Sequence, residues 1–348
     1  MSTPFPRPIN FRDGRVDMSH GSGGRAMAQL IHELFVTHFD NDYLRAQNDG
    51  ACFPLPAGSG RMVMATDSHV VSPLFFPGGD IGCLAVHGTV NDVAMAGGRP
   101  LYLSAGFILE EGFPLADLKR IVISMAQAAK EAGVPIITGD TKVVEKGKGD
   151  GVFINTTGIG IVPPGIDLAP SKIRAGDAIL VSGMLGDHGV AIMSLRENLS
   201  FDTAIQSDTA ALHDLVATML AAVPEIRTLR DPTRGGLATV LNEFALAARC
   251  GMLIREPVIP IRPAVNAACE LLGLDPLYVA NEGKLVAICP AERATELLAL
   301  MRAHPLGADA AIIGEVIEDA NHFVQMETAF GGRRMVDWLS GEQLPRIC

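Results

Sequence analysis

Apolar and polar residues alternate along this chain with a helical spacing in some segments and a strand-like spacing in others. The first periodic segment, "RAMAQLIHELFVTHF" at 25–39, repeats its apolar residues every three to four positions, which places them on one face of a helix. That face is formed by Met27, Leu30, Ile31, Leu34 and Phe35. We predict the first helix here, with its apolar face against a core.

After a glycine- and proline-rich stretch, short apolar runs alternate with longer segments of helical spacing. The predicted strands of this first half are 61–66, 100–109, 134–140 and 151–162, and the predicted helices are 80–97 and 115–133. Some of these strands follow one another as in a hairpin, whereas others are separated by a helix. This mixture predicts an α+β sheet layered with helices.

A second series of elements follows a proline- and glycine-rich segment at 162–177, which predicts a linker. The predicted strands of this second half are 178–183, 277–289, 310–317 and 322–328, and the predicted helices are 207–222, 235–250, 263–273 and 291–303. The segment "SGMLGDHG" after the first of these strands predicts a turn. We therefore place one domain at 1–165 and a second at 166–325, followed by a C-terminal region at 326–348 with a flexible tail.

Composition narrows the class of protein and its surroundings. The 348 residues are 48% hydrophobic and 19% charged, which is enough material for two globular domains. A net charge of −11 opposes binding to nucleic acid, and no apolar run approaches the roughly 20 residues that cross a bilayer. The six cysteines form no C-x-x-C pair, and the N-terminus lacks an apolar signal core. We expect a cytoplasmic protein with reduced thiols, without nucleic-acid or membrane partners.

Four aspartates are candidates for metal binding because each stands at a loop or strand end beside small residues. They are Asp49, Asp67, Asp92 and Asp231. Mg²⁺ prefers carboxylate oxygens and leaves other positions to water and substrate phosphates. Each aspartate taken alone also fits a cap or a turn, so only the set indicates a metal.

A glycine-rich segment, "HGSGG" at 20–24, precedes the first predicted helix. Backbone N–H groups at such a helix start can bind phosphates. The spacing does not match the P-loop or the dinucleotide-binding fingerprint. Ser22 as an ordinary helix N-cap is the alternative.

Two charged residues have apolar neighbours. Lys142 follows Asp140 at the end of an apolar strand, and Glu282 lies in a turn between two apolar runs. Each is also compatible with a solvated surface position. If both face one cleft, the carboxylate can act as a general base and the ammonium can stabilise negative charge.

The chain ends on a cysteine, Cys348, in "LPRIC". Cys250, Cys269 and Cys289 lack the short pairs of a zinc site and predict buried structural roles. A thiol on a flexible tail can instead carry a covalent group between a partner and its own active site, with Ile347 as an apolar anchor. A terminal cysteine without a function is the alternative.

The motifs "HGSGG", "NDVAMAGGRP", "GDTKVV", "DPTRGGL", "NEGKL" and the terminal "PRIC" stand together in this chain. In combination they resemble the AIR-synthetase-like (PurM-like) ATP-binding superfamily and, within it, the HypE family of carbamoyl dehydratases in [NiFe]-hydrogenase maturation. The resemblance runs over nearly the whole chain. It implies an N-terminal sheet that pairs with that of a second subunit as a barrel-like homodimer core, a C-terminal α/β sandwich domain, and ATP in the cleft between the domains.

The resemblance also implies roles for single residues. Asp49, Asp67, Asp92 and Asp231 match the Mg²⁺ side of the site; Gly21, Ser22, Gly23, Gly24, Asn91 and Asp140 match the nucleotide side; Lys142, Glu282 and Cys348 match the catalytic positions. Asn48 stands where the superfamily has the first aspartate of an Asp-Asp motif, which leaves the number of metal ions open.

The implied reaction begins when a carbamoyltransferase, HypF, loads Cys348 with a carbamoyl group. ATP-dependent dehydration then gives a thiocyanate, and its cyanide passes to iron on a HypC–HypD scaffold complex. Two alternatives remain open from the residues themselves. One is another PurM-like synthetase or kinase that acts on a small molecule, and the other is a partner protein that binds ATP without catalysis.

Overall fold

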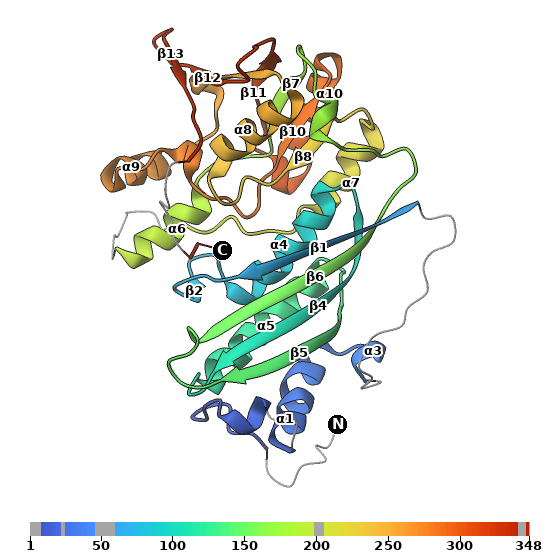
Figure 1. Cartoon of the computed structure of the whole chain (residues 1–348), viewed down its shortest axis with the longest axis vertical. Coiled ribbons are helices and arrows are strands. Elements are labelled where there is room, and N and C mark those ends of the chain that lie inside the picture. Colours follow the sequence, from blue (N-terminus) through green and yellow to red (C-terminus); the bar gives the residue numbers. More distant parts are fainter. Residues whose placement is uncertain (1–7, 22–24, 46–59, 198–204, 340–345, 348) are drawn as a thin grey trace.

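The computed structural model describes residues 8–21, 25–45, 60–197, 205–339 and 346–347, which form two helix-covered sheets (Figure 1). The first half builds a four-stranded sheet and the second half builds a seven-stranded sheet, joined by the segment between them. Within the described residues, no helix combines the length and the apolar character that crossing a membrane requires.

The N-terminal sheet has the strand order β1-β6-β4-β5. Its strands are β1 (Arg61–His69), β4 (Arg99–Glu110), β5 (Ile136–Val144) and β6 (Val152–Val162). β4 runs parallel to β5, and the other neighbours are antiparallel. The four strands predicted in this half of the chain are confirmed.

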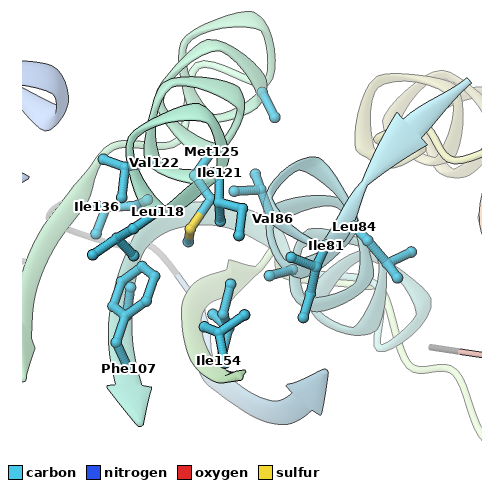
Figure 2. Packing of buried hydrophobic residues seen from close by; sticks show 14 of the residues in the cluster. Ile81, Leu84, Val86, Phe107, Leu118, Ile121, Val122, Met125, Ile136 and Ile154 are labelled. Atoms are coloured by element: carbon cyan, nitrogen blue, oxygen red, sulfur yellow. The ribbon is translucent and has the colours of Figure 1, made fainter. Parts of the chain in front are cut away.

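Two helices, α4 (Ile81–Met95) and α5 (Leu115–Glu131), cover one face of this sheet (Figure 1). α5 buries residues at helical spacing and leaves its other face to solvent. α4 is buried on nearly all sides because it also contacts α7 and β8 of the C-terminal domain. Asp80 caps α4 by accepting from the N–H of Gly82 at 2.7 Å. Figure 2 shows the core in which Leu84 of α4 and Ile121 of α5 pack over the sheet.

The predicted helix at 25–39 is confirmed as one helical stretch with a π-helical centre. It consists of α1 (Arg25–Leu30), η2 (Ile31–Val36) and α2 (Thr37–Phe39). Leu30, Leu34 and Phe35 are buried, as their spacing predicts. The smaller elements of the N-terminal half are η1 (Met18–Gly21), α3 (Asp42–Arg45), β2 (Phe75–Phe76) and β3 (Gly79–Asp80).

The C-terminal sheet has the strand order β13-β12-β9-β11-β7-β10-β8. Its strands are β7 (Ala178–Val181), β8 (Thr228–Arg230), β9 (Gly251–Arg255), β10 (Val286–Cys289), β11 (Ala311–Ile317), β12 (Val324–Glu327) and β13 (Arg333–Met335). Only β9 and β12 pair in parallel among these strands. The sheet continues to β13, so it includes residues that we assigned to the C-terminal tail region.

Helices cover both faces of this sheet. Ile179 and Val181 of β7 pack in one core with α8 (Gly236–Ala248). Ala178 and Leu180 pack in another core, together with α7 (His213–Ala222) and α10 (Ala291–Ala303). A strand that is buried on both faces has apolar residues at every position, which explains the sequence "AILV" of β7.

Several predicted boundaries are wrong in this half of the chain. The strand predicted at 277–289 shortens to β10, because η5 (Pro276–Tyr278) and the turn around Glu282 occupy its first part. The turn predicted in "SGMLGDHG" leads directly into a helix, α6 (Asp187–Arg196), as a strand-to-helix connection predicts, although the sequence did not indicate bounds for that helix. The remaining elements are α9 (Pro263–Leu272), η3 (Pro170–Lys172), η4 (Glu256–Val258) and η6 (Pro305–Gly307).

Candidate functional site

Three of the predicted aspartates come together where the two domains meet. Asp67 stands near the end of β1, Asp92 in the last turn of α4, and Asp231 directly after β8. A cavity of about 540 Å³ lies between the domains, and both Asp92 and Asp231 line it. The fourth aspartate, Asp49, lies outside the described residues.

The charges of these carboxylates are coupled. Burial raises the pKa of Asp92 to about 7, and the charges of Asp231 and Asp67 add to the shift. Burial also raises the pKa of Asp231 to about 6, with a further contribution from Asp67. Mutual repulsion in a partly desolvated site favours a cation. The cleft therefore has the electrostatic character of a place where positive charge binds.

The carboxylates do not form a closed metal cage. Across the described ranges, no three His, Cys, Asp or Glu side chains are arranged so that they could hold a metal ion by themselves. Mg²⁺ commonly takes one or two protein carboxylates and completes its shell with water and substrate phosphates. Asp92 and Asp231 fit such an open site, which a nucleotide would complete.

Arg234 is a residue of this site that the sequence analysis did not single out, although it lies within "DPTRGGL". It lines the same cavity, and its charge lowers the pKa of Asp92 against the stronger effect of burial. The two glycines that follow have positive φ, 75° at Gly235 and 59° at Gly236. A Cβ at Gly236 would lie 2.6 Å from the carbonyl oxygens of Leu277 and Val279. The motif therefore needs glycine to turn the chain into α8.

Glu282 is a buried carboxylate beside this cluster. Its side chain is only 3% exposed, and Oε1 has no hydrogen-bond partner in the described part of the chain. Burial raises the pKa of Glu282 well above its usual range, and the charges of Asp231 and Asp208 raise it further. A buried carboxyl group whose pKa is raised in this way holds a proton more strongly than in water, which suits a general acid or base.

Backbone hydrogen bonds fix the position of Glu282. Its N–H donates to Asp208 Oδ1 at 3.0 Å, and Asp208 forms a 3.2 Å ion pair with Lys284. Asn91 Nδ2 donates to the Glu282 carbonyl at 3.2 Å and to the Ala210 carbonyl at 3.0 Å. Asn91 therefore joins α4 to the loop that carries Glu282. A contact between Asn91 and a nucleotide stays a prediction.

A second group of predicted residues lies elsewhere on the N-terminal sheet. Asp140 and Lys142 stand on β5 and form a 2.9 Å ion pair. η1, which ends at Gly21, contacts the same strand. β5 and β1 are the opposite edges of the sheet. Within the described residues, one chain thus does not bring Lys142 to Glu282. Ser22, Gly23 and Gly24 lie outside the description.

The C-terminal end of the chain reaches the boundary between the domains. Ile347 is 3% exposed and packs in the core of the N-terminal domain. Its role as an apolar anchor inside the active-site pocket stays a prediction. The short red segment at 346–347 lies near α6 and β2 (Figure 1). Cys348 itself lies outside the described residues.

The burial predicted for Cys250, Cys269 and Cys289 is confirmed at two of these positions. Cys269 and Cys289 are buried, whereas Cys250 is partly exposed. Burial raises the pKa of the Cys269 thiol to about 11 and that of Cys289 to about 12. Neither thiol is ionised at neutral pH, so neither is a nucleophile.

Comparison with known proteins places the chain in a family. Residues 47–162 match the AIR synthase related protein, N-terminal domain, and residues 174–327 match its C-terminal domain. The chain is 72% identical to carbamoyl dehydratase HypE of Cupriavidus necator over 344 residues, which cover 99% of this chain and 98% of that protein.

Two solved structures extend the comparison. The crystal structure of hydrogenase maturation protein HypE in complex with ATP is 52% identical, with a TM-score of 0.91, over 95% of this chain and 99% of that one. The crystal structure of a HypE–HypF complex contains a chain that is 50% identical, with a TM-score of 0.78, over 89% of this chain and 99% of that one. Both similarities extend over the two domains and the cleft between them.

Proposed function

We propose, from the premise that this chain belongs to the HypE family of AIR synthase related proteins, that it uses ATP to dehydrate an S-carbamoyl group on Cys348 to a thiocyanate. The product supplies the cyanide ligand of the iron in [NiFe]-hydrogenase. The observation that carries the proposal is the buried Glu282, which lies beside the carboxylate cluster of an interdomain cleft.

The chemistry requires the carbamoyl oxygen to become a leaving group. Transfer of the γ-phosphoryl group of ATP to that oxygen releases ADP and forms an O-phosphorylated imidate on the cysteine sulfur. One N–H proton is lost as the imidate forms. The C–O bond then breaks, phosphate leaves with the oxygen, and the nitrogen loses its one remaining proton to give Cys–S–C≡N. Glu282 is suited to accept an N–H proton, because a carboxylate with a raised pKa is a stronger base.

The other residues of the cleft bind and orient the nucleotide. Arg234 lines the cavity and can pair with phosphate oxygens. Asp92 and Asp231 would hold Mg²⁺, which when bound neutralises charge on the phosphates. HypF is the donor that loads Cys348, in keeping with the HypE–HypF complex of a relative. We infer a HypC–HypD scaffold complex as the acceptor of cyanide.

Intact-mass analysis tests this function. The chain is incubated with HypF, carbamoyl phosphate and ATP, and the adduct on the C-terminal peptide is followed with time. We expect a carbamoyl adduct that becomes one water lighter, with one ADP formed for each dehydration and two phosphates for each thiocyanate, one from carbamoyl phosphate and one from ATP. Cys348→Ala is the matched control and should form neither the carbamoyl adduct nor the thiocyanate. The variant should still fold, since a terminal side chain contributes little to folding.

The same measurement separates the alternatives. An adduct that never loses water contradicts the dehydratase. Phosphorylation of a free small molecule by Cys348→Ala would instead indicate a PurM-like kinase or synthetase. ATP binding without phosphate release would indicate a non-catalytic partner protein.

We also propose that two copies associate through the face of the N-terminal sheet that α4 and α5 leave uncovered. Met62, Met64 and Ile108 on this face are 55%, 69% and 45% exposed. The pairing register places Lys142 beside Ile108, on the same face. Within the described residues, neither edge strand of this sheet, β1 or β5, pairs with a further strand on its outer side. Closing two such sheets into a barrel-like dimer core would bury the apolar face and remove the open edges.

This dimer gives Lys142 a route to the active site. Lys142 lies on the uncovered face of the sheet, so association would carry it into an interface where it can act on the partner's site. Lys142→Ala and Glu282→Gln homodimers should each accumulate carbamoyl-Cys348. A mixed dimer of the two variants contains one site with both native residues if Lys142 acts in trans, and it should regain dehydration.

The mixed-dimer measurement uses subunits with different affinity tags, purified in sequence. If Lys142 acted within its own chain, both sites of the mixed dimer would lack one group. A mixed dimer as slow as either homodimer would therefore contradict the role in trans. Lys146→Ala, a nearby exposed lysine in the turn after β5, is the matched control.

A further inference from the structure

Two side chains of α6 hold the last described residues of the chain. His188 Nε2 lies 2.8 Å from the carbonyl oxygen of Ile347. Arg196 donates through Nη2 to the carbonyl oxygen of Arg346, and through Nε to that of Ser72 at 2.5 Å. The backbone N–H of Ser72 also donates to the Arg346 carbonyl, at 3.2 Å. Two successive carbonyls of the tail are therefore bound by groups from both domains.

The hydrogen bonds of His188 fix its tautomer. A carbonyl oxygen can only accept, so Nε2 carries the proton that it donates to Ile347. Nδ1 lies 2.7 Å from Ser207 Oγ, and Ser207 Oγ itself accepts the N–H of Thr209 at 3.2 Å. The Ser207 hydroxyl is thus free to donate to Nδ1. This neutral imidazole agrees with burial, which lowers the pKa of His188.

Packing keeps the imidazole in place. His188 is fully buried, and the ring of Phe76 meets it edge-on with the ring centroids 5.5 Å apart. Ile347 lies in the same apolar core as Phe76. Phe76 and Ser207 lie outside the tail, so groups of the folded domains orient the donor that meets it, which lowers the entropic cost of docking.

The Ile347 carbonyl has a particular place in the chain, because it belongs to the peptide unit that leads into Cys348. A peptide unit is planar, so fixing its oxygen together with the preceding residue restricts the N and Cα atoms of the following residue. His188 also contacts Ser207, and the next residue, Asp208, accepts the N–H of Glu282. Ser207, which binds the imidazole of His188, and Asp208, which binds the backbone of Glu282, are thus adjacent in the chain.

We propose that His188 and Arg196 are positioning residues that hold the C-terminal tail so that the group on Cys348 meets Glu282 during dehydration. The proposal rests on the proposed function and assigns it two residues that touch the backbone of the tail rather than the reacting atoms. Because the contacts are to carbonyl oxygens, they depend on where the tail lies and not on its side chains.

The first test compares His188→Leu with His188→Gln. Leucine removes both hydrogen bonds, whereas the glutamine amide can still donate to the Ile347 carbonyl and accept from Ser207. Each variant is loaded with carbamoyl by HypF, isolated, and given ATP for a single turnover. We expect dehydration to slow about 10- to 100-fold in His188→Leu and to recover substantially in His188→Gln, with loading and ATP binding unchanged.

The second test measures how quickly iodoacetamide alkylates Cys348 in the unloaded chain without ATP. Loss of the clamp should raise this rate several-fold in His188→Leu and in Arg196→Lys, since lysine keeps the charge but cannot span both carbonyls. His213→Leu removes another largely buried imidazole that is remote from the tail, with a side chain 13% exposed. It is the matched control and should leave the rate unchanged.

The outcomes separate the clamp from the proposed function. Native dehydration and alkylation rates in His188→Leu and Arg196→Lys would overturn the clamp. Equal slowing in the Leu and Gln variants, with native alkylation, would also contradict it. If the loaded native chain lost no water with ATP, the dehydratase function would fail, whereas the alkylation comparison would still decide whether these residues hold the tail.

Discussion

Glu282→Gln is expected to bind ATP and to accept carbamoyl on Cys348, yet to dehydrate the adduct about 10² to 10⁴ times more slowly. The substitution keeps the shape of the side chain and removes its ability to take a proton. Glu282 is only 3% exposed. Its burial raises the pKa of the carboxyl group, and the neighbouring carboxylates raise it further. Intact-mass analysis of the loaded variant during a single turnover measures the rate.

The control for this prediction is Glu296→Gln, which removes an exposed carboxylate from α10, remote from the cleft. It should dehydrate at the native rate. If Glu282→Gln formed thiocyanate as quickly as the native chain, proton transfer would have to be assigned to another group. Calorimetry of ATP binding to Glu282→Gln shows whether the cleft of this variant remains intact.

Asp92→Asn is expected to lower Mg²⁺-dependent ATP hydrolysis about 10²-fold, because it removes a carboxylate that faces the interdomain cavity. The same substitution should stabilise the fold above neutral pH. The pKa of Asp92 rises from its ordinary value of 3.8 to about 7 in the folded chain. A variant that is more stable and less active is typical of a residue retained for function.

The sign of the stability effect follows from proton linkage. Between about pH 4 and pH 7 the folded state holds a proton on Asp92 that the unfolded state has lost, so the free energy of unfolding falls as pH rises through this range. Asparagine does not ionise, so the variant does not show this fall in the free energy of unfolding. We expect the Tm of Asp92→Asn at pH 8 to exceed the native Tm by roughly 2–4 °C, and the difference to shrink at pH 5.

Thermal unfolding of Asp309→Asn provides the comparison, because Asp309 is an exposed carboxylate of the C-terminal domain. Its Tm should follow the native value at both pH values. A lower Tm for Asp92→Asn at pH 8, or native ATP hydrolysis, would show that the Asp92 carboxylate contributes to folding rather than to the nucleotide site.

The local sequence was sufficient to predict a helix or strand wherever the element's own pattern of apolar residues indicates its type. The segment 115–133 predicted α5, and apolar runs predicted β7 and β10. It was insufficient for β8, β9 and β13, which are three to five residues long and are stabilised by their neighbours in the sheet. The bounds of α6 were not predicted, because Gly186 precedes the helix and Gly189 lies in its first turn, and closely spaced glycines are typical of a turn.

The sequence by itself determined the domain pair, the aspartates, Glu282 and the terminal cysteine as candidates, because residue type and short spacing carry that information. Only the tertiary structure decided which candidates meet. Asn91 and the Glu282 carbonyl are 191 positions apart, and His188 and Ile347 are 159 apart. Contacts over such separations depend on how the two sheets pack around α4, and no local pattern encodes them. For the same reason the sequence grouped Lys142 with Glu282, whereas the folded chain places Lys142 on the uncovered face of the sheet.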